Sequence, residues 1–196
     1  MQDKRLYIIG GCNGAGKTTA SFNILPDLLN CKEFVNADEI ARGLSPFQPE
    51  KVSIEAGRLM LKRIEELINS KQDFSFETTL STKSFIHTIV KAKSCGYYIT
   101  LIFFWLESVE LAKDRVRKRV LEGGHNIEPD VIERRYKAGI KNLFKIYSGK
   151  VDSVLIYDNS IPESELIAEK EIENDSFTIH NPQKFNKLKT ISDEQQ

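Results

Sequence analysis

The sequence has few residues of the kinds that build disulfide frameworks or metal centres. Three cysteines and three histidines are scattered along 196 residues, at Cys12, Cys31, Cys95, His87, His125 and His180. No two cysteines form a CxxC pair and the histidines form no cluster, so ligation of a metal by these side chains is not expected. The cysteines are instead expected to be reduced thiols, as in cytoplasmic proteins.

Long apolar runs, an excess of charge of one sign and internal repeats are also missing. The longest apolar run, Ile99 to Leu106, is interrupted by Thr100 and is far too short to span a bilayer. The chain begins without a signal-peptide pattern. Its 28 basic residues balance its 28 acidic ones, which gives no argument for a nucleic-acid or membrane partner. We therefore expect one cytoplasmic domain with no nucleic-acid and no membrane partner.

The most informative stretch that is present is a glycine-rich loop near the start of the chain. Residues 11–18 read Gly-Cys-Asn-Gly-Ala-Gly-Lys-Thr and fit the pattern G-x-x-x-x-G-K-[ST], between a short apolar run and a segment that can be helical. Such a loop turns backbone N–H groups toward phosphates, and the helix N-terminus adds further donors. The predicted nucleotide-binding residues of this stretch are Gly11, Asn13, Gly14, Ala15, Gly16, Lys17, Thr18 and Thr19. Lys17 is expected to reach the β- and γ-phosphates, and Thr18 to ligate Mg²⁺.

Apolar strands and amphipathic helices alternate along the rest of the chain. Strands are predicted at about 5–9, 34–35, 74–76, 98–106 and 154–157, and helices or turns at 16–25, 39–44, 50–68, 83–95, 108–122 and 130–147. Asp38, Ser108 and Asp130 are expected to cap the segments that follow them. The alternation predicts an α/β fold, a three-layer P-loop kinase fold with a mainly parallel sheet and helices on both faces. In such sheets, ligands bind beyond the carboxyl ends of the strands.

The last part of the chain differs in composition. Apolar segments at 166–168 and 177–179 flank a polar turn at 173–175 and predict a small peripheral hairpin. Residues 181–196 are polar and are expected to fray or to form a short helix. We therefore divide the chain into a P-loop kinase core over 1–160, with a helical lid at about 108–146, and a hairpin and polar tail over 161–196 of the same domain.

Two acids at predicted strand ends are candidates for chemistry. Asp38 can accept or orient the proton of an acceptor hydroxyl that faces the γ-phosphate, or it can serve only as a helix cap. Glu77 can hold Mg²⁺ through water or bind the acceptor, unless it is a solvated loop carboxylate. Asn36 and Thr78 lie beside these acids and are assigned to the acceptor. Arg58 faces the same end of the sheet if its helix packs as expected.

Arginines gather on two helices that a glycine-rich break separates. Arg115 and Arg119 are four residues apart and share a helical face, while Arg134 and Arg135 lie on the next helix. Two such helices make a lid whose guanidinium groups can close over the transferring phosphate; a solvated basic face is the other interpretation. Arg119 and Arg134 are assigned to catalysis, together with Lys17 and Asp38. Arg115 and Arg135 are assigned to nucleotide binding. His125, in the break, is expected to be structural rather than a general base.

Four blocks of this sequence, in this order and spacing, resemble the zeta toxin family of P-loop kinases in its short form. They are 11–18, Asn-Ala-Asp-Glu-Ile-Ala at 36–41, Phe-Glu-Thr-Thr-Leu-Ser at 76–81, and 119–125 running on to Arg-Arg-Tyr at 134–136; Tyr-Asp-Asn-Ser at 157–160 fits as well. The resemblance implies a kinase that uses ATP or GTP with Mg²⁺. It places Asp38 as the proposed base and Glu77 near the substrate and the metal, and it places the lid arginines among the four named above.

In the best-known members of that family, the acceptor is the 3′-hydroxyl of the amino sugar in UDP-N-acetylglucosamine, and an antitoxin protein restrains the enzyme. Many relatives have proline where this chain has Cys12, which adds a backbone N–H and should preserve phosphate binding. We predict an ATP-dependent small-molecule kinase with a nucleotide-sugar substrate and a possible antitoxin partner. The alternatives are a P-loop ATPase or switch, whose D-x-x-G and L-S-G-G-Q motifs are absent, and a non-catalytic nucleotide-binding module with a protein partner.

Overall fold

The structure is a computed structural model of the chain, and it describes residues 4–24, 29–124, 126–172, 174 and 176–194. Its elements, in chain order, are β1 (Lys4–Gly10), α1 (Lys17–Ile24), β2 (Phe34–Val35), α2 (Ala37–Leu44), the 3₁₀-helix η1 (Pro49–Val52), α3 (Ser53–Asn69), β3 (Phe74–Thr78), α4 (Ile86–Ser94), β4 (Tyr97–Trp105), α5 (Val109–Leu121), α6 (Pro129–Asn142), the π-helix η2 (Leu143–Tyr147), β5 (Ser153–Asp158), β6 (Glu165–Glu171), β7 (Thr178–Ile179) and α7 (Pro182–Asp193). The predicted strands all form, with ends that differ by a few residues.

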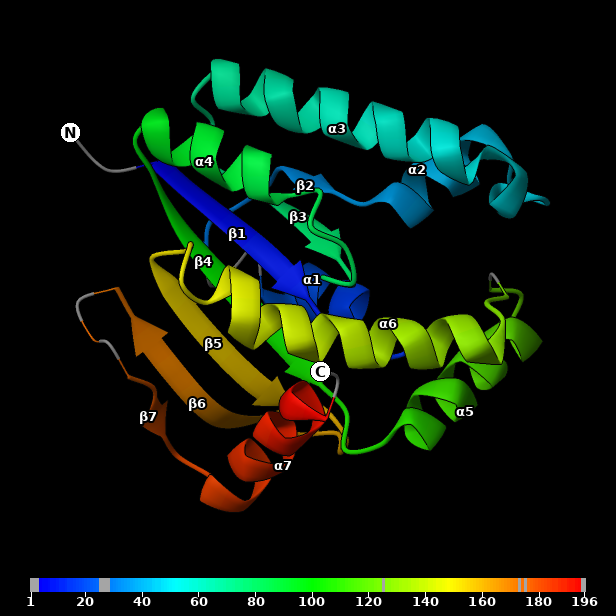
Figure 1. Cartoon of the computed structure of the whole chain (residues 1–196). Coiled ribbons are helices and arrows are strands. Elements are labelled where there is room, and N and C mark those ends of the chain that lie inside the picture. Colours follow the sequence, from blue (N-terminus) through cyan, green and yellow to red (C-terminus); the bar gives the residue numbers. More distant parts are fainter. Residues whose placement is uncertain (1–3, 25–28, 125, 173, 175, 195–196) are drawn as a thin grey trace.

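The strands form one sheet in the order β2-β3-β1-β4-β5-β6-β7. The pairs from β2 to β5 are parallel, and β6 and β7 are added in antiparallel orientation. In Figure 1, α1 lies behind the sheet and α6 in front of it, so helices cover both faces. The predicted three-layer α/β fold with a mainly parallel sheet is therefore confirmed.

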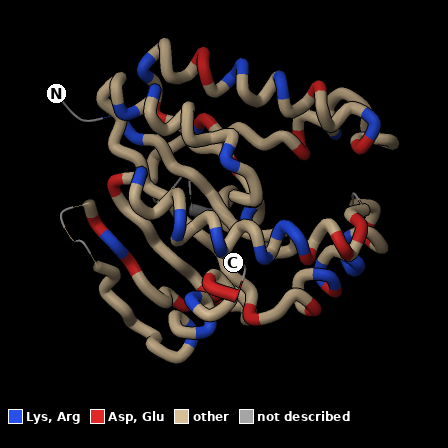
Figure 2. Tube along the Cα trace, in the orientation of Figure 1, with Lys and Arg blue, Asp and Glu red and all other residues tan. Residues whose placement is uncertain are grey.

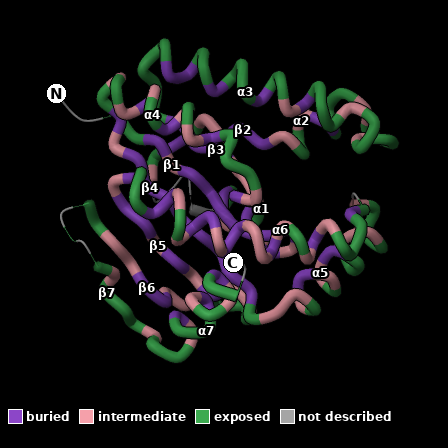
Figure 3. Tube along the Cα trace, in the orientation of Figure 1, coloured by how far each residue is buried: buried purple, intermediate pink, exposed green. Residues whose placement is uncertain are grey.

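The core is built on β4, which lies between β1 and β5. Every residue of this strand except Tyr98 is buried, and the strands form the buried interior in Figure 3. A strand of a parallel sheet has both faces covered, which explains the nearly continuous apolar sequence. Gly10 at the end of β1 lies opposite Thr78 of β3 and Phe103 of β4. The loop after β1 therefore starts level with the end of β3.

The starts of three helices test the predicted caps. Ser108 caps α5 as expected, because its hydroxyl accepts a hydrogen bond from the backbone N–H of Leu111. The prediction for Asp38 was wrong: Asn36 is the cap of α2, and its side chain accepts from the N–H of Asp38 at 2.8 Å. The prediction for Asp130 was also wrong, because α6 already begins at a proline, Pro129. Proline fits the first helical position, where no N–H is needed.

The C-terminal segment is more ordered than its composition suggests. β6 pairs with β5 and so continues the central sheet, although the predicted turn at 173–175 lies partly outside the described residues. α7 packs against α6 and β6 and buries Phe185 and Leu188. These two residues are three apart and lie on one helical face, which gives the polar segment an apolar stripe.

Charges of both signs are interspersed along α3, α5 and α6 (Figure 2), in agreement with the formal net charge of zero. None of the helices in the described part of the chain is long and apolar enough to cross a membrane. Neither His125 nor Leu25 and Pro26, at the predicted end of the first helix, can be placed, because they lie outside the described residues.

Candidate active site

The loop between β1 and α1 has the backbone conformation that phosphate binding requires. Gly11, Gly14 and Gly16 have φ angles of 140°, 81° and 77°, which residues with a Cβ rarely adopt. A Cβ on Gly11 would lie 2.3 Å from the carbonyl oxygen of Phe104, and one on Gly14 would lie 2.7 Å from that of Ala112. Side chains at these glycines would therefore push the loop away from β4 and α5.

Four polar side chains meet beside this loop. Lys17 Nζ donates to the carbonyl oxygen of Cys12 at 2.9 Å and pairs with Glu77 Oε1 at 3.3 Å. The other carboxylate oxygen, Oε2, accepts hydrogen bonds from Thr18 Oγ1 at 2.7 Å and from Asn36 Nδ2 at 3.0 Å. The Lys17 and Glu77 side chains are only 5% and 11% exposed. A shielded carboxylate next to a threonine hydroxyl provides the oxygen ligands that Mg²⁺ prefers.

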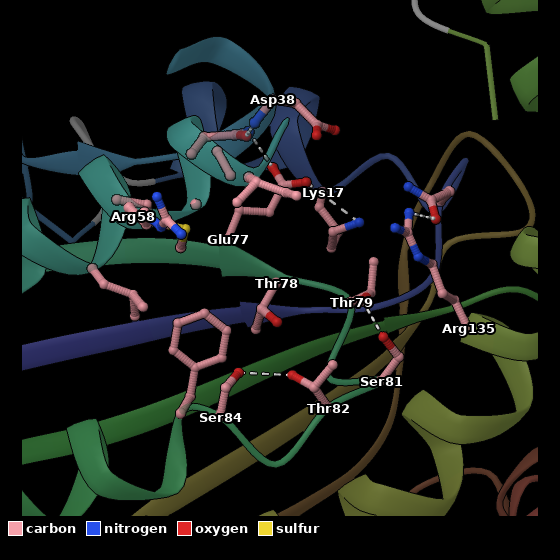
Figure 4. Close-up of a pocket in the computed structure, with 18 residues that line it drawn as sticks. Lys17, Asp38, Arg58, Glu77, Thr78, Thr79, Ser81, Thr82, Ser84 and Arg135 are labelled. Carbon is pink, nitrogen blue, oxygen red and sulfur yellow. Dashed lines mark hydrogen bonds and ion pairs between the residues drawn. The ribbon is translucent and has the colours of Figure 1, made fainter. Parts of the chain in front are cut away.

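A cavity of about 500 Å³ opens beside this cluster. Its walls come from the β1–α1 loop, α2, α3, the segment after β3, and α6. Figure 4 shows the lining side chains converging on it. Predicted site residues in the lining are Asn13, Lys17, Asn36, Asp38, Glu77, Thr78 and Arg135. Asp38 and Lys17, from separate elements, therefore share one cavity.

A smaller cavity of about 180 Å³ lies over the phosphate loop. The predicted nucleotide-binding and lid residues that line it are Gly14, Gly16, Thr18, Thr19, Arg115 and Arg119. It shares Asn13, Lys17, Asp38 and Glu77 with the larger cavity. The two cavities thus adjoin at these four side chains, and an occupant of one can touch an occupant of the other.

Arg115 and Asn159 tie the loop after β5 to the phosphate loop and to α5. The Arg115 guanidinium donates to the carbonyl oxygens of Asn159 at 2.8 Å and Ser160 at 2.9 Å. Asn159 Nδ2 donates to the carbonyl oxygen of Ala15 at 2.7 Å and would lie 2.6 Å from a Cβ on Gly16. Asn159 was not among the predicted site residues. The polar Asp-Asn-Ser run at the end of a central strand was the signal that could have found it.

The two adjacent arginines of α6 differ in position. Arg135 Nη1 donates to Asn13 Oδ1 at 3.1 Å and lines the larger cavity. Burial lowers the pKa of Arg135, the nearby charge of Asp38 opposes this effect, and Arg134 adds to it. Arg134 is exposed and is not among the side chains that line either cavity. The structure thus brings Arg135 to the site, whereas the catalytic role assigned to Arg134 stays a prediction.

The segment after β3 forms one wall of the larger cavity in a strained conformation. Leu80 is fully buried and has a φ of 54°, which is rare for a residue with a Cβ. Asn142 Nδ2 donates to the carbonyl oxygen of Leu80 at 2.7 Å, and the Tyr147 hydroxyl donates to that of Thr82, also at 2.7 Å. Backbone strain of this kind persists where surrounding contacts hold it. α6 and η2 therefore fix the shape of this wall.

Known proteins share both the sequence and the fold. A sequence model of the zeta toxin family matches residues 2–171. An uncharacterized protein of Haemophilus influenzae is 34% identical over 137 residues, which are 69% of this chain and 94% of that protein.

Among solved structures, the AvrRxo1-ORF1:AvrRxo1-ORF2 complex with sulphate ions matches with a TM-score of 0.77 at 18% identity, over 95% of this chain but only 63% of that chain. The same complex with ATP matches with a TM-score of 0.74. The PezAT toxin–antitoxin system of Streptococcus pneumoniae matches with a TM-score of 0.65 at 16% identity, over 98% of this chain and 85% of that one. The family model covers most of the sequence, and the chain therefore belongs to the zeta toxin family and has the P-loop kinase fold.

Proposed function

We propose that this chain is an ATP-dependent kinase that transfers the γ-phosphate to a hydroxyl group of a nucleotide sugar, with UDP-N-acetylglucosamine as the first acceptor to test. The main support is that Lys17, Asp38 and Glu77 line two adjoining cavities at once. One cavity covers the phosphate loop, and the other extends toward α3 and the segment after β3. A nucleotide and an acceptor can therefore meet at these three side chains.

The residues over the loop fit a nucleoside triphosphate with Mg²⁺. The glycines give the loop its anion-binding backbone, and Lys17 supplies a shielded ammonium group. Thr18 and Glu77 would hold Mg²⁺, which neutralises phosphate charge when it is bound. The related complex solved with ATP supports ATP as the nucleotide. Comparing the two nucleotides in the same assay separates ATP from GTP.

The side chains of the site then take separate tasks. Asp38 accepts the proton of the acceptor hydroxyl while the hydroxyl oxygen attacks the γ-phosphorus. The bond between that phosphorus and the β–γ bridging oxygen breaks, and ADP leaves. Lys17 binds the transferred phosphoryl group. Arg119, from the smaller cavity, and Arg135, from the larger one, add positive charge. Stabilising the negative charge of the transferring group is the main catalytic requirement of phosphoryl transfer. Asn36 positions Glu77 through its hydrogen bond of 3.0 Å.

The larger cavity suits a nucleotide sugar in size and character. Its volume of about 500 Å³ lies within the range of roughly 300–1,000 Å³ that is typical of small-molecule sites. Hydroxyl groups of Thr78 and Thr79 can bind a sugar, while Ile54 and Phe85 form apolar surface for a ring. The related structures include a two-protein complex and a toxin–antitoxin system, which supports an antitoxin partner for this chain. We propose the cytoplasm as the location.

The replacement Asp38→Asn tests the proposed base. Because the variant lacks the carboxylate that accepts the proton, the rate of transfer should fall at least roughly 100-fold, while the affinity for ATP stays the same. The rate of transfer is measured as product formation from labelled ATP and UDP-N-acetylglucosamine, and the affinity for ATP is measured by calorimetric titration. Glu39→Gln is the matched control, because Glu39 is adjacent, exposed and paired only loosely with Arg42 at 3.8 Å. Unchanged transfer by Asp38→Asn would remove Asp38 from the mechanism.

The same assay separates the alternatives. Phosphate release with no phosphorylated product from a panel of nucleotide sugars and nucleosides would favour an ATPase. No turnover of any kind, together with tight binding of a protein partner, would favour a non-catalytic module. Phosphorylation of a different acceptor from the panel would support the proposed kinase activity and identify that compound, instead of UDP-N-acetylglucosamine, as the acceptor.

A further inference from the structure

One arginine in the wall of the larger cavity has its charge available. Arg58 of α3 is an exposed residue that lines this cavity. In Figure 4 it lies at the opposite end of the drawn residues from Arg135. Among the described residues, no hydrogen bond, ion pair or ring contact engages its guanidinium. The position agrees with the expectation that Arg58 faces the carboxyl ends of the strands.

Other arginines nearby are already occupied. Arg63, five residues further along α3, binds Glu33 at 2.8 Å. Arg115 donates to two backbone carbonyls, and Arg135 donates to Asn13. A guanidinium left open in a cavity is suited to bind a phosphate or carboxylate through two parallel hydrogen bonds.

The acids of the cavity do not neutralise Arg58. Glu77 is engaged by Lys17, Thr18 and Asn36, and Asp38 interacts electrostatically with Arg135. The remaining polar side chains of the lining are uncharged amides and hydroxyls, such as the hydroxyl pair of Thr82 and Ser84, whose oxygens are 2.7 Å apart. Hydroxyls can donate to an anion but cannot balance the charge of an arginine.

We infer that Arg58 binds an anionic group of the acceptor, a phosphate or diphosphate, at the end of the cavity away from the phosphate loop. This inference rests on the proposed function, which makes the cavity the acceptor site. The acceptor then carries its reactive hydroxyl near Asp38 and its negative charge near Arg58. Neutral sugars and nucleosides lack the second contact and are poor acceptors.

Kinetics of Arg58→Met test this role. Loss of charge-assisted hydrogen bonds should raise the KM for UDP-N-acetylglucosamine roughly 10- to 100-fold, and leave the KM for ATP unchanged. Turnover of neutral N-acetylglucosamine should be equally poor in the wild type and the variant. Lys62→Met is the matched control, because it removes one positive charge from an exposed position of the same helix. Equal KM values for UDP-N-acetylglucosamine in Arg58→Met and Lys62→Met would overturn the inference.

A binding measurement separates this inference from the proposed function. The phosphate loop is first filled with Mg²⁺ and a non-hydrolysable ATP analogue, and inorganic pyrophosphate is then titrated by calorimetry. Pyrophosphate should bind the wild type and Lys62→Met equally and Arg58→Met at least roughly tenfold more weakly. If no acceptor is ever phosphorylated, the proposed function fails while this titration still decides the role of Arg58. Equal pyrophosphate binding by all three proteins would overturn that role.

Discussion

Cys12 shows how burial decides the chemistry of a side chain in the phosphate loop. Its thiol is only 4% exposed. Burial raises the pKa of Cys12 from 9.0 to about 11, although Lys17 and a backbone hydrogen bond act in the opposite direction. Only the thiolate is a good nucleophile. Burial therefore makes Cys12 a poor nucleophile, in agreement with the expectation of a reduced thiol.

Alkylation should therefore spare Cys12 in the folded protein. At pH 8 a thiol with a pKa near 11 is ionised on the order of one part in a thousand, and burial also restricts access. Iodoacetamide should modify Cys95, which is half-buried, and leave Cys12 and Cys31 intact, as peptide mass mapping can show. In denaturant all three should react. Modification of native Cys12 as fast as Cys95 would contradict the buried loop.

Sequence reasoning predicted the position of two side chains that the structure brings together. Lys17 belongs to a motif, and Glu77 was found because parallel strands bring their carboxyl ends to one edge. It failed where two residues of similar chemistry compete for one position: Asn36 and Asp38 can both cap a helix. The sequence also does not decide which of Arg134 and Arg135 faces a cavity, because adjacent helical residues point about 100° apart and only packing settles their orientation.

At the scale of elements, α6 and η2 support the wall of the larger cavity that the segment after β3 forms. Asn142 and Tyr147 donate to backbone carbonyls of the segment after β3, and Gly139 approaches the same segment closely. A Cβ on Gly139 would lie 2.6 Å from the carbonyl oxygen of Thr79. This close approach requires glycine although the residue lies within a helix.

Gly139→Ala should therefore move the wall. We expect a loss of about 1–3 kcal/mol in the free energy of unfolding from overpacking, and a higher KM for the acceptor with an unchanged KM for ATP. Urea denaturation and steady-state kinetics measure these effects. Gly43→Ala is the control, because Gly43 lies in α2 with nothing within 4 Å of its added Cβ, and should gain about 0.5–1 kcal/mol. Equal effects of the two replacements would contradict the proposed support.

Sequence patterns predicted which segments form helices and strands better than they predicted where these elements end or what they pack against. The long apolar run of β4 and the periodic α3 were predicted nearly in full. By contrast, the segment that forms α7 was expected to fray or to form only a short helix because its residues are mostly polar. Its stability depends on the packing of Phe185 and Leu188 against α6 and β6. Such tertiary contacts override weak local signals and are not visible in a single sequence.

At the scale of the whole molecule, the C-terminal segment is connected to the active site. Lys184 of α7 pairs with Asp158 at the end of β5, and with Glu165 of β6, each at 2.6 Å. Asp158 is 2% exposed and also accepts hydrogen bonds from the backbone and hydroxyl of Ser160. Asn159, between them, holds the phosphate loop. We therefore propose that residues 161–196 belong to the same folded domain as residues 1–160 and do not form a separate tail.

Lys184→Met should destabilise the protein by about 2 kcal/mol, because it leaves the buried carboxylate of Asp158 without its cation. We place the loss below the largest values for buried pairs because Lys184 is 29% exposed and Ser160 still donates to Asp158. Lys145→Met is the control: Lys145 also joins α7 to the rest of the protein, through Asp193, but both partners are about half exposed, and such pairs contribute little.

The loss should also depend on pH. Burial alone would raise the pKa of Asp158, but the hydrogen bonds from Lys184 and Ser160 outweigh it and hold the pKa below the unfolded value of 3.8. A lowered folded-state pKa stabilises the protein above the unfolded pKa and ceases to do so as the pH falls through the folded one. The difference in the free energy of unfolding between Lys184→Met and the wild type, measured by urea denaturation, should therefore be largest at pH 7 and shrink toward pH 3. A constant difference across this range, or a similar loss in Lys145→Met, would show that the buried pair does not anchor α7.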